Sequence, residues 1–152
     1  MTIEMRPARQ DEGPRLKEIA IAAKSHWGYD RESVAHWADQ GDFSPDGLAK
    51  LAVFVAEANG RAVGWSSIVR KGDAWWLEDL WVEPDWMGKD VGSQLFRSAA
   101  AHARSAGAEL LQWEAEPHAV GFYERMGARR LRDSEPSAWG RIISVMGLDL
   151  AN

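Results

Sequence analysis

The sequence predicts an α/β fold of the α+β kind, in which one mixed, mostly antiparallel sheet of about six or seven strands carries helices on both faces. Three apolar runs with strand character, at residues 51–58, 61–69 and 74–82, predict an antiparallel meander. The succession strand, helix, strand across residues 74–115 predicts a parallel pair of strands. Outside the meander, apolar residues recur at helical spacing, which predicts the helices that cover the two faces of the sheet.

In the first part of the chain, polar and apolar residues alternate briefly, and the apolar residues then recur at helical spacing. Residues 2–6 predict an edge strand that Pro7 ends. Apolar residues within 11–24 recur at the spacing of one helix face. Asp30 is a candidate N-cap for a second helix, and we expect the turn-rich residues 41–47 to form a loop.

The middle of the chain changes to strand periodicity. Asn59-Gly60 is a two-residue hairpin signal between the first two strands, and a second turn precedes residues 74–82. A helix follows from about residue 90 to residue 105, ended by Gly107. We expect the remaining elements to be a strand at 109–115, a short helix at 118–126 and strands at 130–133 and 141–150.

The amino-acid composition excludes several classes of function and several kinds of site. The 18 basic and 23 acidic residues leave a net charge of −5, which argues against a general nucleic-acid binder. The absence of cysteine removes disulfides, thiolate metal sites and a cysteine nucleophile, and is compatible with the cytoplasm. No run approaches the roughly 20 apolar residues of a membrane span, so no membrane is implied. We expect residues 1–152 to form a single domain.

The most informative segment is residues 77–96, where a strand leads through a Pro84 turn into a glycine-bearing loop that opens a helix. The first turn of a helix has unpaired N–H groups and the positive end of the helix dipole. Gly88 and Gly92 let an anion approach the main chain closely. This is neither a P-loop nor a dinucleotide fingerprint, because both glycine patterns are missing.

Residues 77–131 resemble the acetyl-CoA-binding half of the GNAT superfamily of N-acetyltransferases. Residues 87–92 lie where that family has its Gln/Arg-x-x-Gly-x-Gly/Ala loop, and 116–128 resemble its helix beside the cofactor thiol. Residues 24–29 resemble the acceptor-side loop of a bacterial subset. The resemblance implies a single acyl-CoA N-acyltransferase domain that transfers acetyl from acetyl-CoA directly to a primary amine of a small molecule or peptide, without a metal. Homodimerisation is common in the family.

The resemblance also implies the cofactor contacts. The backbone of Leu80, Trp81 and Val82 is expected to polarise the thioester or pair with the pantetheine arm, between parallel strands that separate there. His118 is either a helix cap or a cofactor contact. The other implied contacts are Met87, Gly88, Lys89, Asp90, Val91, Gly92, Ser93 and Phe122.

Two residues of the loop depart from the family pattern. Met87 replaces Gln or Arg, and Asp90 replaces the usual middle glycine. A carboxylate about 6 Å from a diphosphate costs roughly 0.7–3 kcal/mol. Asp90 is alternatively an N-cap that turns toward the first amides of the helix. In both cases it competes for donors that the cofactor would use.

The resemblance makes Tyr123 the candidate acid, since a phenol can protonate a departing thiolate. The alternative is an amphipathic core tyrosine. Glu78 is the candidate base, directly or through water, because an acid within an apolar strand can have a raised pKa. Asp79 is the candidate base instead if the strand presents its two faces the opposite way round.

The segment between the two expected helices contains His26, Trp27 and Tyr29. These residues are candidates for a lid over the acceptor, whose aromatic faces would hold a cationic amine. The alternative is that Trp27 and Tyr29 pack the helical layer. His36 and His102 lack a histidine four residues on, so no zinc pair is predicted.

Two rival functions remain. A GNAT-like module that binds acyl-CoA or senses a ligand without turnover is favoured by the Met87 and Asp90 departures. A tryptophan-rich carbohydrate-binding module is weaker, because the nine tryptophans accompany at least three helical patterns.

Overall fold

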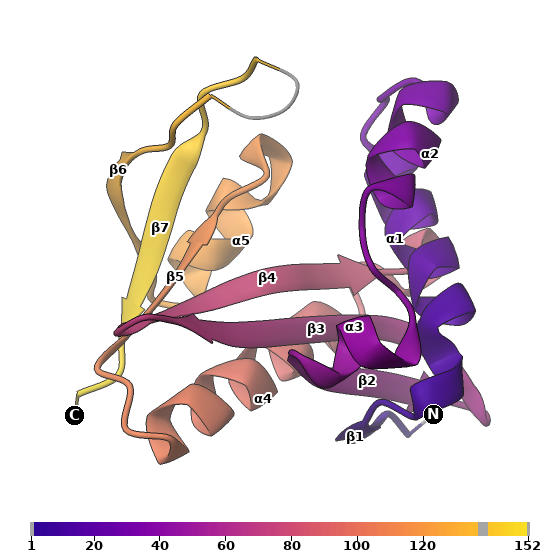
Figure 1. Cartoon of the computed structure of the whole chain (residues 1–152), viewed down its shortest axis with the longest axis horizontal. Helices are drawn as coiled ribbons and strands as arrows, with labels where there is room; N and C mark the ends of the chain where they lie inside the picture. The colour runs from indigo at the N-terminus through magenta and orange to yellow at the C-terminus, as the bar shows by residue number, and fades with distance from the viewer. Residues whose placement is uncertain (1, 137–139, 152) are drawn as a thin grey trace. The chain divides into compact units, whose positions relative to one another are not determined.

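The computed structural model describes residues 2–136 and 140–151 (Figure 1). The strands are β1 Glu4–Pro7, β2 Ala52–Ala58, β3 Arg61–Lys71, β4 Ala74–Val82, β5 Leu110–Glu114, β6 Arg129–Asp133 and β7 Ser144–Asp149. The helices are α1 Gly13–His26, α2 Arg31–Asp39, α3 Pro45–Ala49, α4 Val91–Ser105 and α5 Val120–Arg125. Short 3-10 turns lie at Gln10–Glu12, Pro84–Trp86 and Pro117–Ala119.

The strands form one seven-stranded sheet in the order β1-β2-β3-β4-β5-β7-β6. Antiparallel pairing joins β1 to β2, β2 to β3, β5 to β7 and β6 to β7. The predicted parallel pair is present, since β4 and β5 are in register at Trp75–Leu111 and Trp76–Gln112. The predicted fold class, a mixed and mostly antiparallel sheet with covering helices, is therefore confirmed.

Several predicted boundaries were wrong. The expected loop at 41–47 contains the start of α3, whose N-cap Ser44 accepts a hydrogen bond from the Gly47 amide at 3.1 Å. A helix of five residues is too short to show a period. The expected strand at 141–150 begins only at Ser144, and the expected helix at 118–126 is a 3-10 turn followed by α5.

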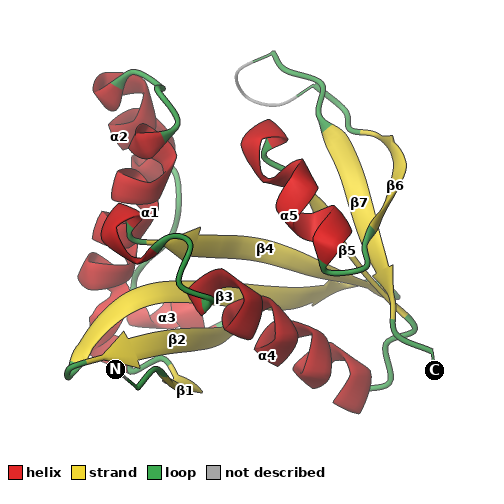
Figure 2. Ribbon diagram, turned by 180° about the vertical axis from the view of Figure 1, so that it is seen from behind, coloured by secondary structure: helices red, strands yellow, loops and turns green. Residues whose placement is uncertain are grey.

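Packing divides the chain into two compact units, residues 1–69 with 78–99 and residues 70–77 with 100–152. Whether they form a single domain stays a prediction. In the first unit, α3 lies in front of the strands in Figure 1, and the start of α4 lies in front of them in the opposite view of Figure 2. Separate apolar clusters fill the two faces. One joins α1 and α3 to Val55 and Trp65, and the other joins α4 to Ala56 and Val63.

In the second unit, α5 packs against β5 through aromatic rings. Trp113 and Tyr123 are buried, with their ring centroids 4.9 Å apart. Arg132 of β6 donates a hydrogen bond to Gln112 of β5 at 3.1 Å. Tyr123 is thus packed within its own unit.

The start of α4 lies very close to β3. A Cβ placed on Gly64 would be 2.9 Å from Leu95 Cδ1, 3.0 Å from the Trp81 carbonyl oxygen and 3.2 Å from Val91 Cγ1. Ser66 of β3 also donates a hydrogen bond to the Leu95 carbonyl at 3.3 Å. Only glycine permits this spacing between α4, β3 and the backbone of β4.

We expect Gly64→Ala to lower the free energy of unfolding by about 1–3 kcal/mol, because the added methyl overpacks a closed interface. Denaturant titration measures the change. Gly121→Ala in α5 is the matched control, because its Cβ meets only the flexible end of Arg125 at 3.4 Å. It should be neutral or stabilising by up to about 1 kcal/mol. Equal losses in the two variants would contradict the close approach.

Candidate functional site

The loop before α4 is open to solvent. Gly88, Lys89 and Asp90 are exposed, whereas the next residue, Val91, is 1% exposed and packs in the apolar cluster beneath α4. Gly88 has φ 76°, a left-handed conformation that favours glycine, and a Cβ there would meet open space. The loop therefore presents main-chain amides at the end of a well-anchored helix.

Asp90 takes the left-handed conformation as well, with φ 67°. Its carbonyl accepts the first helical hydrogen bond, from the Gln94 amide at 3.2 Å. Asp90 therefore occupies the N-cap position of α4, with a left-handed φ in place of the usual extended backbone. That its side chain turns toward the first amides of the helix stays a prediction. Lys89 lies with its ammonium 5.2 Å from the centre of the Trp86 ring.

The turn that joins β4 to this loop is tied to α1 and β3. Arg15 of α1 donates a 2.5 Å hydrogen bond to the Glu83 carboxylate and a 2.8 Å bond to the Ala62 carbonyl. The Glu83 amide bonds to the Val63 carbonyl at 2.9 Å. Both side chains of the ion pair are about one-fifth exposed, so solvent screens the pair only partly. These bonds fix the path of the chain from β4 into the loop.

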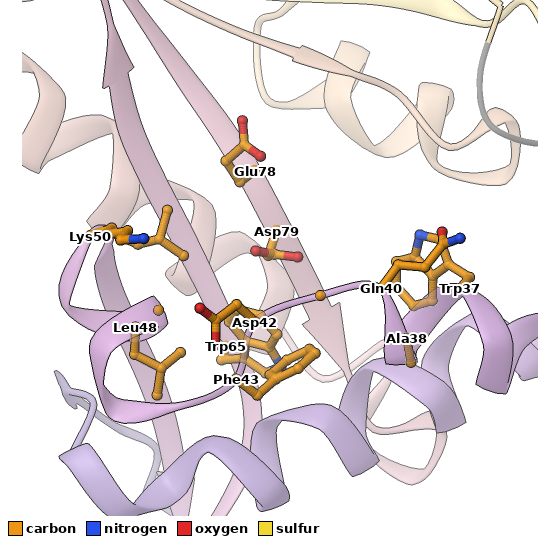
Figure 3. A pocket seen from close by; sticks show the side chains of 13 residues that line it. Trp37, Ala38, Gln40, Asp42, Phe43, Leu48, Lys50, Trp65, Glu78 and Asp79 are labelled. Carbon is orange, nitrogen blue, oxygen red and sulfur yellow. The ribbon is translucent and has the colours of Figure 1, made fainter.

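A pocket of about 430 Å³ lies entirely within the first unit (Figure 3). Trp37 of α2 and Phe43 of the following loop supply apolar walls. The charged residues on its lining are Asp42, Lys50, Glu78 and Asp79. Asp42 and Glu78 outnumber Lys50 even without a charge on Asp79, so the lining is favourable to a cationic ligand.

Glu78 and Asp79 leave neighbouring positions of β4 in different directions (Figure 3). Asp79 accepts hydrogen bonds from Ser67 Oγ at 2.6 Å and from Trp81 Nε1 at 3.0 Å. Burial raises the pKa of the Asp79 carboxyl, and these two bonds partly oppose the rise. Glu78 is exposed. The acid with the raised pKa is therefore Asp79, which shares a face with Trp81 as the alternation of the strand predicts.

The predicted acceptor-side segment, with His26, Trp27 and Tyr29, lies at the C-terminal end of α1. The helix ends at His26, Trp27 is its C-cap, and Gly28 turns the chain with φ 90°. The rings of His26 and Trp27 meet edge to face at 5.0 Å, and the Tyr29 ring lies 5.0 Å from the Lys24 ammonium. Trp27 and Tyr29 are half-buried, so the structure leaves both the lid and the packing interpretation in place.

The other predicted site residues belong to the second unit. Tyr123 is buried, and Phe122 lies edge to face with it at 5.2 Å. His118 lies inside the 3-10 turn, with Nδ1 2.9 Å from Glu116 Oε1. Glu116 occupies the N-cap of that turn and Ala119 the N-cap of α5, so the cap interpretation of His118 was wrong.

Sequence reasoning missed Asp42, Phe43 and Lys50 as pocket residues. The only local signal was the turn-rich composition of residues 41–47. Their shared position depends on how the loop before α3 lies against β4, which no local period encodes. Among the described residues, no helix is both long and apolar enough to cross a membrane.

Comparison with known proteins gives a consistent result. The model of the acetyltransferase (GNAT) family matches residues 14–128. An uncharacterised N-acetyltransferase from Methanocaldococcus jannaschii is 30% identical over 84 residues, which cover 49% of this chain and 37% of that protein. The match thus spans well under half the length of this curated relative.

Two solved structures share the whole fold. A GCN5-related N-acetyltransferase from Rhodopseudomonas palustris is 24% identical with a TM-score of 0.82, over 99% of this chain and 97% of that one. The PaiA N-acetyltransferase from Thermoplasma acidophilum, in complex with coenzyme A, is 18% identical with a TM-score of 0.81, over 98% and 99%. At these identities the matches show the fold.

We expect Asp79→Asn to change how stability depends on pH. A raised pKa means that the folded state holds the proton more tightly than the unfolded state. The wild type should therefore lose stability relative to Asp79→Asn as pH rises from about 4 through the raised pKa. Urea titrations across this range measure the difference.

Asp39→Asn is the control for this measurement, because the hydrogen bond from Lys17 lowers the pKa of the exposed Asp39 carboxyl. The sign should reverse at lower pH: the wild type should gain stability relative to Asp39→Asn as pH rises through the lowered pKa to about 4, so the titrations of this pair extend below pH 4. A pH-independent difference between wild type and Asp79→Asn would show that Asp79 is not desolvated.

Proposed function

The chain belongs to the acetyltransferase (GNAT) family, and we propose that it is an N-acetyltransferase. It transfers the acetyl group of acetyl-CoA directly to a primary amine of a small molecule or peptide, in a ternary complex. The observation that carries this proposal is the exposed, glycine-bearing loop at the start of α4, within the segment that the family model matches.

The loop is proposed to bind the cofactor diphosphate. Exposed amides at a helix N-terminus bind anions without basic side chains, which suits a chain of net charge −5. The implied contacts are those of residues 87–93, with Leu80, Trp81 and Val82 toward the thioester and with His118 and Phe122. The coenzyme A complex of the Thermoplasma acidophilum relative supports the choice of ligand.

The chemistry requires one base and one acid. The amine nitrogen attacks the thioester carbon, the carbon–sulfur bond breaks, and the sulfur leaves as a thiolate. Glu78 is proposed to take the amine proton, directly or through water, because it lines the pocket and is exposed. Tyr123 is proposed to protonate the thiolate. Asp79 is the alternative base, supported by its raised pKa.

The acidic pocket is proposed to take the acceptor. Its three carboxylates and its aromatic walls favour a cationic amine, and the segment with His26, Trp27 and Tyr29 is proposed as its lid. A cytoplasmic location and a homodimer stay predictions.

Free-thiol release from acetyl-CoA with a panel of amines tests the function. We expect turnover with at least one cationic amine. Glu78→Gln and Tyr123→Phe should each reduce kcat by about 10²-fold or more, because each removes a proton-transfer group. Retained binding of acetyl-CoA shows that each variant is folded. If Asp79→Asn abolishes turnover and Glu78→Gln does not, Asp79 is the base. Tight binding with no thiol from any amine would favour the sensing module.

We expect Asp90→Gly to tighten acetyl-CoA binding several-fold, because it removes a carboxylate about 6 Å from a diphosphate at a position where φ favours glycine. Asn59→Gly is the matched control: Asn59 also has a positive φ, 55°, but lies in the β2–β3 turn. It should leave binding unchanged. Asp90→Asn removes the charge while keeping the side chain. Weaker binding by Asp90→Gly in calorimetry would count against the loop as the diphosphate site.

A further inference from the structure

Three aromatic rings of the first unit surround one ammonium group. The Lys24 Nζ atom lies 5.0 Å from the centre of the Tyr29 ring, 4.9 Å from Trp37 and 5.8 Å from Trp81. All three distances lie within the range of a favourable cation–π contact. Lys24 itself lies in the last turn of α1. We call Tyr29, Trp37 and Trp81 the aromatic cage.

The cage is held by the rest of the unit and does not depend on the lysine alone. Trp37 and Trp81 both pack against the apolar cluster between α1 and the sheet, with their rings edge to face at 5.2 Å. Trp81 Nε1 donates a hydrogen bond to Asp79 at 3.0 Å, which fixes the plane of its indole. Gly28, with φ 90°, turns the chain so that Tyr29 returns over Lys24.

The cage adjoins the acidic pocket. Trp37 belongs to both, and Asp79 lines the pocket while it orients Trp81. A molecule in the pocket therefore lies against one wall of the cage. The lysine that fills the cage is half-buried on a flexible four-carbon stem, so it can leave without any change in the helix backbone.

We propose that the cage is a cation-binding subsite of the acceptor site, occupied in this structure by Lys24, and that an alkylammonium group on the acceptor displaces the lysine. The acceptor then carries two nitrogen centres: the primary amine that reacts and a second, cationic centre that binds the cage. An alkylated ammonium is favoured over the lysine, because a primary ammonium is strongly hydrated and loses more hydration between aromatic faces. The role of the cage in acceptor binding rests on the proposed function, whereas its ability to bind a cation does not.

A binding experiment that needs no turnover tests the cage. Lys24→Ala removes the internal cation, and alanine is the best helix former. Titration with tetramethylammonium chloride, followed by NMR of the indole N–H signals against a sodium chloride blank, should shift Trp37 and Trp81. The variant should bind at least about tenfold more tightly than the wild type, since no internal cation competes. The double variant Lys24→Ala/Trp37→Leu should lose this binding.

Lys17→Ala is the matched control, because Lys17 lies two turns earlier on the same helix and its ammonium pairs with Asp39 at 2.6 Å. It should bind tetramethylammonium as the wild type does. Equal gains in the two lysine variants would overturn the proposal, and so would a folded Lys24→Ala protein whose two indole signals do not respond.

An activity measurement then tests whether the cage serves the acceptor. Two primary amines of equal length are compared, one ending in a trimethylammonium group and one in a neutral tert-butyl group. Lys24→Ala should lower KM for the cationic amine about tenfold and leave KM for the neutral amine unchanged. Equal changes for both amines would overturn the assignment of the cage to the acceptor. If no amine releases thiol, the proposed function fails, and the tetramethylammonium titration still decides whether the cage binds cations.

Discussion

The close approach of α4 to β3 at Gly64 is the constraint on which the proposed site depends. Because no side chain separates them there, Val91 and Leu95 pack directly on the sheet. The start of α4 is thus fixed beside the backbone of Trp81, and the residues before it remain exposed. A bulkier residue at position 64 would displace both the helix whose amides are proposed to bind the diphosphate and the strand segment proposed to meet the thioester.

The end of β4 lies between the two parts of the proposed site, because its side chains alternate between the two faces of the sheet. Leu80 and Val82 pack in the cluster beneath α4, next to the loop for the diphosphate. Asp79 and Trp81 lie on the other face, toward α1 and α2, where the acidic pocket and the aromatic cage are built. One short strand therefore has the proposed diphosphate loop beside one face and the proposed acceptor pocket on the other. Burial of Asp79 keeps a carboxyl of raised pKa at the junction.

The parts of this arrangement that sequence could predict are those with local causes. The bounds of β4, at 74–82, follow from its apolar run, and the span of α4 from its helical period and Gly107. Sequence could not decide between Glu78 and Asp79, because the surroundings of Asp79 depend on residues distant in the chain, such as Ser67, which lies twelve residues away on the neighbouring strand and donates a hydrogen bond to it. The aromatic cage was missed for the same reason, since its rings come from three separate segments.

An acceptor amine faces a conflict, because its positive charge draws it into an acidic pocket whereas only its neutral form attacks a thioester. A pocket that bound only the reacting ammonium would hold the nitrogen most tightly in its unreactive form. A second cationic centre in the cage resolves the conflict when it is a quaternary ammonium, because the aromatic faces bind its charge and it has no proton for a base to remove. The reacting nitrogen can then lose its proton to Glu78 or Asp79 while the molecule stays bound. The neighbouring positions of Trp37, Trp81 and the two carboxyls allow this division of roles.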